Sequence, residues 1–161
     1  MKFKVVPEPP DSLETVAAIH AAVSLVPDEE VSCCARLMQR TTVDSQDRAK
    51  EWLTFLRALG LAEEVDGKYR RVQRDIDPGE LREAFRERVY LADEVLSVVD
   101  LVDDSLDSRA VFERVQTRVT QWERLRHTDP ETVWHERVRR LLDWAVLLEL
   151  LVLDDDGYRP R

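Results

Sequence analysis

The stretch that decides the fold runs from Glu30 to Val72 and reads EVSCCARLMQRTTVDSQDRAKEWLTFLRALGLAEEVDGKYRRV. Glu30–Gln39 predicts a short helix, and a polar turn follows it. A second helix is predicted from Ser45 to about Leu59, with Ser45 or Asp44 as its N-cap. One side of this helix is expected to pack while the other meets water or a ligand. Its apolar residues recur at helical spacing: Ala49, Trp52, Leu53, Leu56 and Leu59.

A β-hairpin is predicted directly after this helix. Gly60 stands where a left-handed C-terminal cap is expected. Leu61–Val65 and Lys68–Val72 flank Asp66-Gly67, a dipeptide typical of two-residue hairpin turns. The order helix, turn, helix, hairpin resembles the winged helix-turn-helix superfamily of DNA-binding proteins, of the kind found in haloarchaeal transcriptional regulators. The resemblance implies a mainly α fold with small β-hairpin wings.

The remaining segments are predicted to be helical. A helix capped by Asp11 is expected to reach Val26, and one that begins at Pro78 to continue to about Val102. Ser108 starts another helix, and Pro130 the last, which runs to about Leu150 before a small terminal hairpin. The helix predicted over 78–102 carries two neighbouring apolar stripes, which serve either its own core alone or a partner helix as well.

The end of the chain resembles the end of the first motif. WLTFLRALGLAEEVDGKYR at 52–70 and LLDWAVLLELLVLDDDGYR at 141–159 share a tryptophan-containing helix, a leucine run and an acidic turn. With the glycines matched, the tyrosines fall one residue out of step. This weak repeat is compatible with a second winged helix, whose wing would be acidic through Asp154–Asp156. We therefore expect an N-terminal winged helix over 1–75 and a helical domain over 76–161.

Charge is distributed unevenly along the chain. The net charge is −9, yet residues 36–74 hold nine basic and six acidic side chains, a net of +3. Such a basic island is typical of a DNA-binding face, although a short window in a highly charged chain can reach this balance by chance. Twenty of the 24 basic residues are arginine, and with the acidic excess this resembles the proteome of a salt-adapted archaeon. Near 1 M salt the Debye length is only ~3 Å, so short-range contacts would dominate binding.

Candidate DNA-binding residues lie in the turn, the second helix and the wing. In the winged-helix reading, helix 45–59 enters the major groove with the residues near its start, and the wing over 61–72 contacts the DNA backbone. The candidates are Thr41, Thr42, Ser45, Gln46, Arg48, Lys50, Arg57, Lys68, Arg70, Arg71 and Arg74.

Signatures of catalysis and of metal binding are missing from the sequence. It has no phosphate loop, nucleophile elbow or His-Glu-x-x-His motif, so we expect neither an enzyme nor a cofactor. His127, Glu131 and His135 lie in one region but lack a clear third ligand for a metal. Cys33-Cys34 is interpreted as a pair of buried reduced thiols in a cytoplasmic protein. No apolar run has the ~20 residues of a membrane span.

These observations favour a sequence-specific DNA-binding protein, a transcriptional regulator that binds double-stranded DNA. The C-terminal helices would then serve a homodimer or a protein partner. The alternative is a tandem winged-helix adaptor that joins proteins in a chromosome or transcription complex without reading DNA. The acidic second half of the chain favours the adaptor, and the basic island favours DNA binding.

Overall fold

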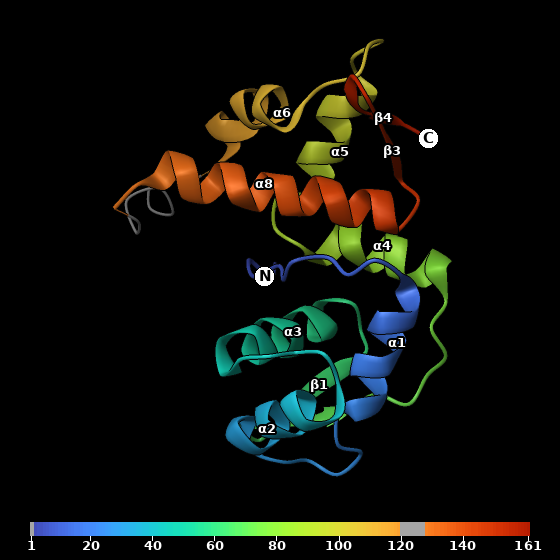
Figure 1. The fold of residues 1–161 in the computed structure, drawn as a ribbon, viewed down its shortest axis with the longest axis vertical. Helices are drawn as coiled ribbons and strands as arrows, with labels where there is room; N and C mark the ends of the chain where they lie inside the picture. Colours follow the sequence, from blue (N-terminus) through green and yellow to red (C-terminus); the bar gives the residue numbers. More distant parts are fainter. Residues whose placement is uncertain (1, 120–127) are drawn as a thin grey trace. The chain divides into compact units, whose positions relative to one another are not determined.

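The computed structural model describes residues 2–119 and 128–161, which form two compact units, 1–89 and 90–161 (Figure 1). The sequence placed the domain boundary between residues 75 and 76, whereas the structure divides the chain after Val89. The later division follows from helix α4 (Pro78–Arg88), which packs on α3 (Gln46–Ala58) within the first unit. In that unit Phe3 also forms a single β-bridge with Val89. No helix in the described part of the chain is long and apolar enough to cross a membrane.

The first unit has the predicted helix-turn-helix and hairpin. Its elements are α1 (Leu13–Ala22), α2 (Glu30–Arg40), α3, β1 (Ala62–Val65) and β2 (Lys68–Arg71). The Ser45 hydroxyl caps α3 by accepting from the Arg48 backbone N–H at 3.2 Å. Gly60 follows α3 with φ +78°, a left-handed conformation that a glycine adopts without steric cost. The caps and the apolar period thus place α3 where the sequence predicted it.

The hairpin is tied to the helices by one residue of its second strand. Asp66 and Gly67 both have positive φ, as a two-residue turn of the favoured hairpin type requires. The register pairs Glu63 with Arg70. Tyr69 then exchanges two backbone hydrogen bonds with Asp28, at 2.8 and 3.0 Å. This bridge fixes the wing against the segment between α1 and α2.

Helix α1 is shorter than predicted. Ser12, and not Asp11, is its N-cap, and it ends at Ala22 instead of Val26. The chain becomes extended after Ala22 because it runs beside the wing: the Ser24 carbonyl accepts from the Arg71 backbone N–H at 2.7 Å. These tertiary hydrogen bonds replace the last helical turn that the sequence pattern indicated.

The single helix predicted over 78–102 is wrong. The chain forms α4 and then α5 (Ala92–Asp100), with Leu91 between them at φ +68°. A non-glycine residue in this region costs about 1 kcal/mol or more, so surrounding contacts must hold it there. Leu91 is 2% exposed, and its burial offsets that cost. Of the apolar positions expected in the two stripes, Val98 and Val102 are half-buried and the others are buried: Phe85, Val89, Leu91, Ala92, Val95, Leu96 and Val99.

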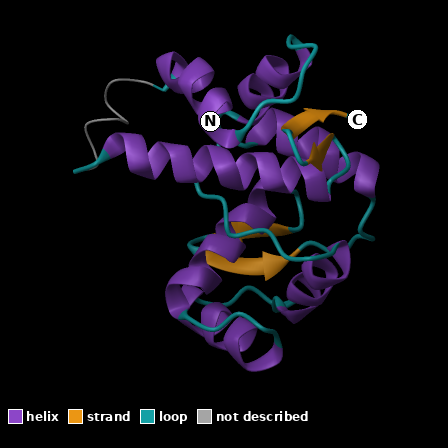
Figure 2. Ribbon diagram, turned by 45° about the horizontal axis from the view of Figure 1, so that its top comes forward, coloured by secondary structure: helices purple, strands orange, loops and turns teal. Residues whose placement is uncertain are grey.

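The second unit repeats the path of the first. It consists of α5, α6 (Ser108–Val115), the 3-10 helix η1 (Gln116–Arg118), α8 (Pro130–Leu147), β3 (Leu151–Asp154) and β4 (Gly157–Pro160). Tyr158 exchanges two backbone hydrogen bonds with Leu106, as Tyr69 does with Asp28. Figure 2 shows the two hairpins among the helices. The C-terminal half is therefore a second winged helix, whose described residues form α5, α6, η1, α8 and a hairpin.

The structure also corrects the register of the internal repeat. Both tyrosines are the second residue of the second wing strand, so Tyr69 corresponds to Tyr158, and Lys68 to Gly157. Matching the glycines of the two turns placed the repeat one residue out. In the correct register Gly60 corresponds to Glu149, and both have left-handed φ values, +78° and +63°.

The second copy is longer than the first. Asp28 and Tyr69 are 41 residues apart, whereas Leu106 and Tyr158 are 52 apart, a difference of eleven. Helix α8 has 18 residues against 13 in α3, which accounts for five of the eleven, and the other six fall in a stretch that includes residues 120–127, outside the described part. The core positions are shared: Phe55 corresponds to Trp144, and both are 0% exposed.

Candidate nucleic-acid interface

One side of α3 faces solvent along its length. At about 100° per residue, Gln46, Asp47, Lys50, Thr54 and Arg57 fall on the side opposite the buried residues. The first three are exposed and the last two half-buried. This face offers amide, hydroxyl and cationic groups with the chemistry to read base edges, but the Asp47 carboxylate lies among them.

The turn before α3 uses its hydroxyl groups for structure. Thr41 donates from its hydroxyl to the Leu37 carbonyl at 2.6 Å and accepts from the Val43 backbone N–H at 3.1 Å. Ser45 is engaged as the N-cap of α3. Of the three candidate hydroxyl residues, Thr42 is the exposed one. The turn therefore positions α3, and Thr42 is its best-placed group for a phosphate.

Two cations near the start of α3 hold carboxylates. Arg48 Nη1 lies 3.5 Å from Asp44 Oδ1, and Lys50 Nζ lies 3.7 Å from Glu30 Oε1 on α2. All four side chains are more than 40% exposed, and exposed pairs of this kind contribute only about 0–1 kcal/mol. Arg48 projects to the flank of the first turn and not to the outer face of α3.

Arg57 joins α3 to the wing. Its guanidinium lies 3.2 Å from the Glu64 carboxylate and stacks over the rings of Phe3 and Tyr69, at 5.3 and 5.6 Å. The Tyr69 hydroxyl donates to Glu30 at 3.4 Å. Burial, with Glu64 and Glu30 nearby, raises the pKa of Tyr69. Arg57 is thus a packed residue that positions the wing, with little of its charge available to DNA.

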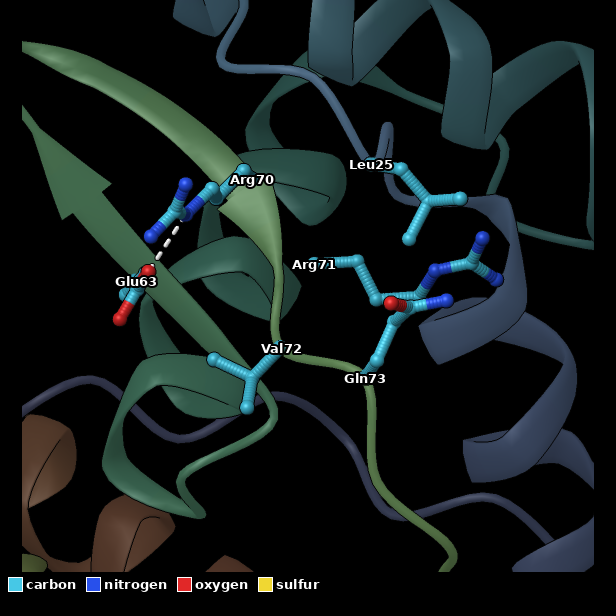
Figure 3. Close-up of a pocket in the computed structure, with 6 residues that line it drawn as sticks. All are labelled: Leu25, Glu63, Arg70, Arg71, Val72 and Gln73. Carbon is cyan, nitrogen blue, oxygen red and sulfur yellow. Dashed lines mark hydrogen bonds and ion pairs between the residues drawn. The ribbon is translucent and has the colours of Figure 1, made fainter.

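The wing cations divide between its two faces. Lys68 and Arg70 are exposed on one face, where Arg70 Nε lies 2.5 Å from Glu63 on the paired strand. Arg71 runs the opposite way, beside Gln73 and Leu25 (Figure 3). Its Nη1 donates to the Ala21 carbonyl at 2.9 Å, so Arg71 caps the end of α1.

Two shallow hollows meet at Arg71. One, of about 330 Å³, is the hollow of Figure 3, and the other, of about 480 Å³, extends past His20 to Arg74 and Asp75. His20 hydrogen-bonds the Val72 carbonyl through Nε2 at 2.8 Å. Arg74 pairs with Glu80 at 2.8 Å, on the first turn of α4. These contacts fix the chain between the wing and α4, so Arg71 and Arg74 lie apart from the exposed wing face.

The aligned face of α8 is engaged inside its own unit. His135, the counterpart of Gln46, hydrogen-bonds Ser108 and lies against Phe112. Arg139, the counterpart of Lys50, lies between Glu136 and Asp143, at 2.5 and 2.8 Å. The Tyr158 hydroxyl donates to Asp143, the counterpart of Thr54. The face that α3 leaves to solvent is thus used for internal bonding in the second copy.

The second wing is acidic, as predicted. Asp154 accepts from the backbone N–H of Asp156 and from Arg159, and these bonds lower the pKa of its carboxyl group. Arg159 corresponds to Arg70, so each wing has one arginine paired with a carboxylate of its own hairpin. The second wing lacks a counterpart of Lys68, because Gly157 stands there.

The sites considered for redox or metal chemistry have a structural character. Cys33 and Cys34 are buried free thiols, and burial, followed by the charge of Asp28, raises the pKa of Cys33 to about 11. Within residues 2–119 and 128–161 no group of three His, Cys, Asp or Glu side chains is placed to hold a metal. His127 lies outside the described residues.

The sequence reading named the cations of this interface and missed their carboxylate partners. Asp44–Arg48 has the i,i+4 spacing of a helical ion pair, and Glu63 faces Arg70 in the hairpin register, so both pairs had a local signal. Glu30–Lys50 joins two helices and had none.

Comparison with known proteins agrees with this double architecture. The sequence profile of one family, described as the halobacterial double winged helix domain, matches residues 1–161. No curated protein and no solved structure matches the chain. The match covers both repeats, and the family's description names the two winged helices that the structure contains. The chain therefore belongs to the halobacterial double winged helix domain family.

Proposed function

We propose that the protein is a sequence-specific DNA-binding protein, a transcriptional regulator whose first winged helix reads duplex DNA. The outer face of α3 would enter the major groove, with Lys68 and Arg70 of the wing on the DNA backbone. The second winged helix would bind a protein partner or a second copy of the chain. A binding role of this kind needs no catalytic group or cofactor.

The observation that carries this proposal is the contrast between α3 and α8. On α3, Gln46 is exposed and Lys50 makes only a long, exposed ion pair with Glu30, whereas their counterparts in α8 make shorter bonds within their unit. The outer face of α3 is therefore the more available of the two for a ligand.

A nearly neutral interface is compatible with DNA binding in a salt-adapted protein. Near 1 M salt the Debye length of ~3 Å removes most long-range attraction and repulsion between protein and phosphate. Binding then depends on hydrogen bonds and shape complementarity at contact distance. The first unit can therefore read DNA without the strong positive field of a low-salt DNA-binding protein.

Fluorescence anisotropy with labelled duplexes from the source genome tests the proposal, at several KCl concentrations. Gln46→Ala with Lys50→Ala should weaken binding by at least roughly 10-fold, because it removes a base contact worth about 1–3 kcal/mol at Gln46 and a phosphate contact at Lys50. The matched control is His135→Ala with Arg139→Ala at the same positions of α8, which should leave DNA affinity unchanged. Equal losses in both double variants, or none in the first, would overturn the assignment of α3.

A second candidate function is the adaptor role, and an exposed stripe on α2 favours it. Val31 and Met38 are 64% and 41% exposed, and with Ala35 they lie on one side of the helix. The counterparts on α6 and η1 are Arg109, Glu113 and Gln116, so the fold forms without an apolar residue at any of these positions. An apolar stripe that the fold does not require indicates contact with another protein.

The adaptor role predicts a different response to mutation. Val31→Arg with Met38→Gln transfers the side chains of the second copy to the first. Co-purification of partner proteins from native lysate should be lost in this variant, while DNA affinity stays the same. If the variant still retains partner proteins, the stripe on α2 is not their binding site. If the wild-type protein retains DNA, it is not a pure adaptor.

A further inference from the structure

Three of the cations proposed to meet DNA phosphates are already paired with carboxylates of the protein. Arg48 holds Asp44, Lys50 holds Glu30, and Arg70 holds Glu63, at 3.5, 3.7 and 2.5 Å. The exposed fractions of these six side chains lie between 43% and 68%. The pairs therefore lie at the surface, where another anion can compete with the carboxylate.

A phosphate that contacts one of these cations has two effects on ions in solution. It releases the cations condensed on the DNA, which makes binding weaker as salt rises. It also displaces a protein carboxylate, which is left beside the negative duplex. A carboxylate in that position is stabilised by a cation from solution, and taking up that cation makes binding stronger as salt rises.

We infer that this surface binds DNA by ion exchange, in which each phosphate replaces a protein carboxylate and each displaced carboxylate takes up one monovalent cation. The inference rests on the proposed function and adds a regulatory property to it. The residues are Arg48, Lys50 and Arg70 as phosphate contacts, with Asp44, Glu30 and Glu63 as carboxylates that take up cations.

The two effects nearly cancel for the three paired cations. Lys68, which the proposed function also places on the DNA backbone, adds one ordinary contact. Four ordinary phosphate contacts give a slope of log K against log salt of about −3.6, a roughly 4000-fold loss of affinity over a tenfold rise in salt. Uptake of three cations contributes a slope of about +3, so the net slope is about −0.6 and the affinity falls only about fourfold over this range.

Arg57 is not part of this exchange. Its side chain is 27% exposed, pairs with Glu64 and stacks on two aromatic rings. Leaving this position would expose apolar surface as well as break an ion pair, so a phosphate competes poorly for it. The exchange is therefore limited to the pairs that have no such packing.

The experiment measures the affinity of the full chain for a fluorescein-labelled duplex pool, sheared from genomic DNA, as KCl is raised tenfold. The wild-type protein should lose only about fourfold in affinity. Asp44→Asn, Glu30→Gln and Glu63→Gln together keep the side-chain shapes and remove the carboxylates. This triple variant should bind more tightly at low salt and lose roughly 4000-fold over the same range.

The matched control removes three carboxylates from ion pairs of the second copy: Glu113→Gln, Glu136→Gln and Glu149→Gln. It changes net charge by the same amount and should keep the weak salt dependence of the wild-type protein. Asp44→Asn alone, at an exposed site, repeats the test if the triple variant is unstable, with an expected slope of about −1.6. A wild-type slope near −3.6 would overturn the ion exchange and leave DNA binding intact. Absence of binding at every salt concentration would overturn the proposed function itself, and the exchange with it.

Discussion

The two winged helices of this chain follow one backbone path and differ in what they do with the same positions. The first leaves the outer face of α3 to solvent and carries Lys68 on its wing. The second bonds the equivalent face internally and places Gly157 at the wing position. Buried positions common to both copies therefore set the fold, whereas the exposed positions differ in residue type and in the bonds they make.

The largest effect is expected in the shared core. Phe55→Ala in the first copy and Trp144→Ala in the second each remove a fully buried ring at the same position. Each should lower the free energy of unfolding by about 3–5 kcal/mol, through lost burial and the cavity left behind. Denaturant unfolding followed by circular dichroism measures both. A loss below 1 kcal/mol in one copy would show that the two cores are not equivalent.

A smaller effect should separate the two wing glycines. A Cβ on Gly157 would lie 2.5 Å from the Leu106 carbonyl oxygen, while a Cβ on Gly67 meets nothing within 4 Å. Both residues have positive φ. Gly157→Ala should therefore cost about 2–4 kcal/mol, from strain and a backbone clash, and Gly67→Ala about 1 kcal/mol. Thermal unfolding of the two variants tests the order, and equal costs would show that the close approach of Leu106 to Gly157 does not constrain the second wing.

The wing tyrosines should differ in the same direction. The Tyr158 hydroxyl donates to Asp143 in a part-buried site, while Tyr69 has a long bond of 3.4 Å to Glu30. Tyr158→Phe should cost about 1.5–3 kcal/mol, the range for a hydrogen bond to a charged group. Tyr69→Phe should cost less, about 0.5–1.5 kcal/mol, because its bond to the Glu30 carboxylate is long and Glu30 is exposed. The urea midpoints of the two variants at neutral pH measure these costs, and a larger loss of stability in Tyr69→Phe would contradict the prediction.

Because of the same tyrosine, the stability of the second copy should fall at alkaline pH. Burial, and then the bond to Asp143, raise the pKa of Tyr158 above its ordinary value of 10.0. Above pH 10 the unfolded chain therefore releases this proton before the folded chain does, and stability falls as pH rises towards the folded pKa. Urea unfolding between pH 9 and 11 should show this loss, and Tyr158→Phe should reduce it. An unchanged pH dependence in the variant would assign the loss to other groups.

The smallest effect should come from the exposed ion pairs. Arg48–Asp44 in the first copy and Arg109–Glu113 in the second are both i,i+4 pairs with side chains more than half exposed. Arg48→Gln and Arg109→Gln should each change the free energy of unfolding by less than about 0.5 kcal/mol. Only Arg48→Gln should also alter DNA affinity. A matching change of affinity in Arg109→Gln would remove the functional distinction between the copies.

Local signals account for what the sequence predicted well. The cap of α3, the apolar period along it and the Asp66-Gly67 turn each act within a few residues, and all three are present in the structure. The second winged helix was visible through the repeat at 52–70 and 141–159, because its wing and third helix keep the same buried pattern. The correspondence of α5 and α6 with α1 and α2 was not recognised, because these helices share few residue types.

The errors arose where tertiary contacts override local preference. Nothing near Leu91 interrupts a helical pattern, because neither glycine nor proline stands there, and only burial holds its left-handed backbone. The alignment of Gly67 with Gly157 was wrong because Gly157 is not a turn residue. It stands where the backbone of Leu106 approaches too closely for a side chain. At the candidate site the residues were predictable from their positions, but the carboxylate that Lys50 meets lies on another helix.

The single bridges from Asp28 to Tyr69 and from Leu106 to Tyr158 have a consequence for how each wing can act. Both backbone groups of a residue next to the hairpin tip are bonded to the helical body, so neither wing can swing as a hinged arm. If the first wing contacts DNA as proposed, it therefore loses little conformational entropy on binding. Adjustment of shape would then have to come from the other molecule, which must bend or widen to accept a stiff ribbon.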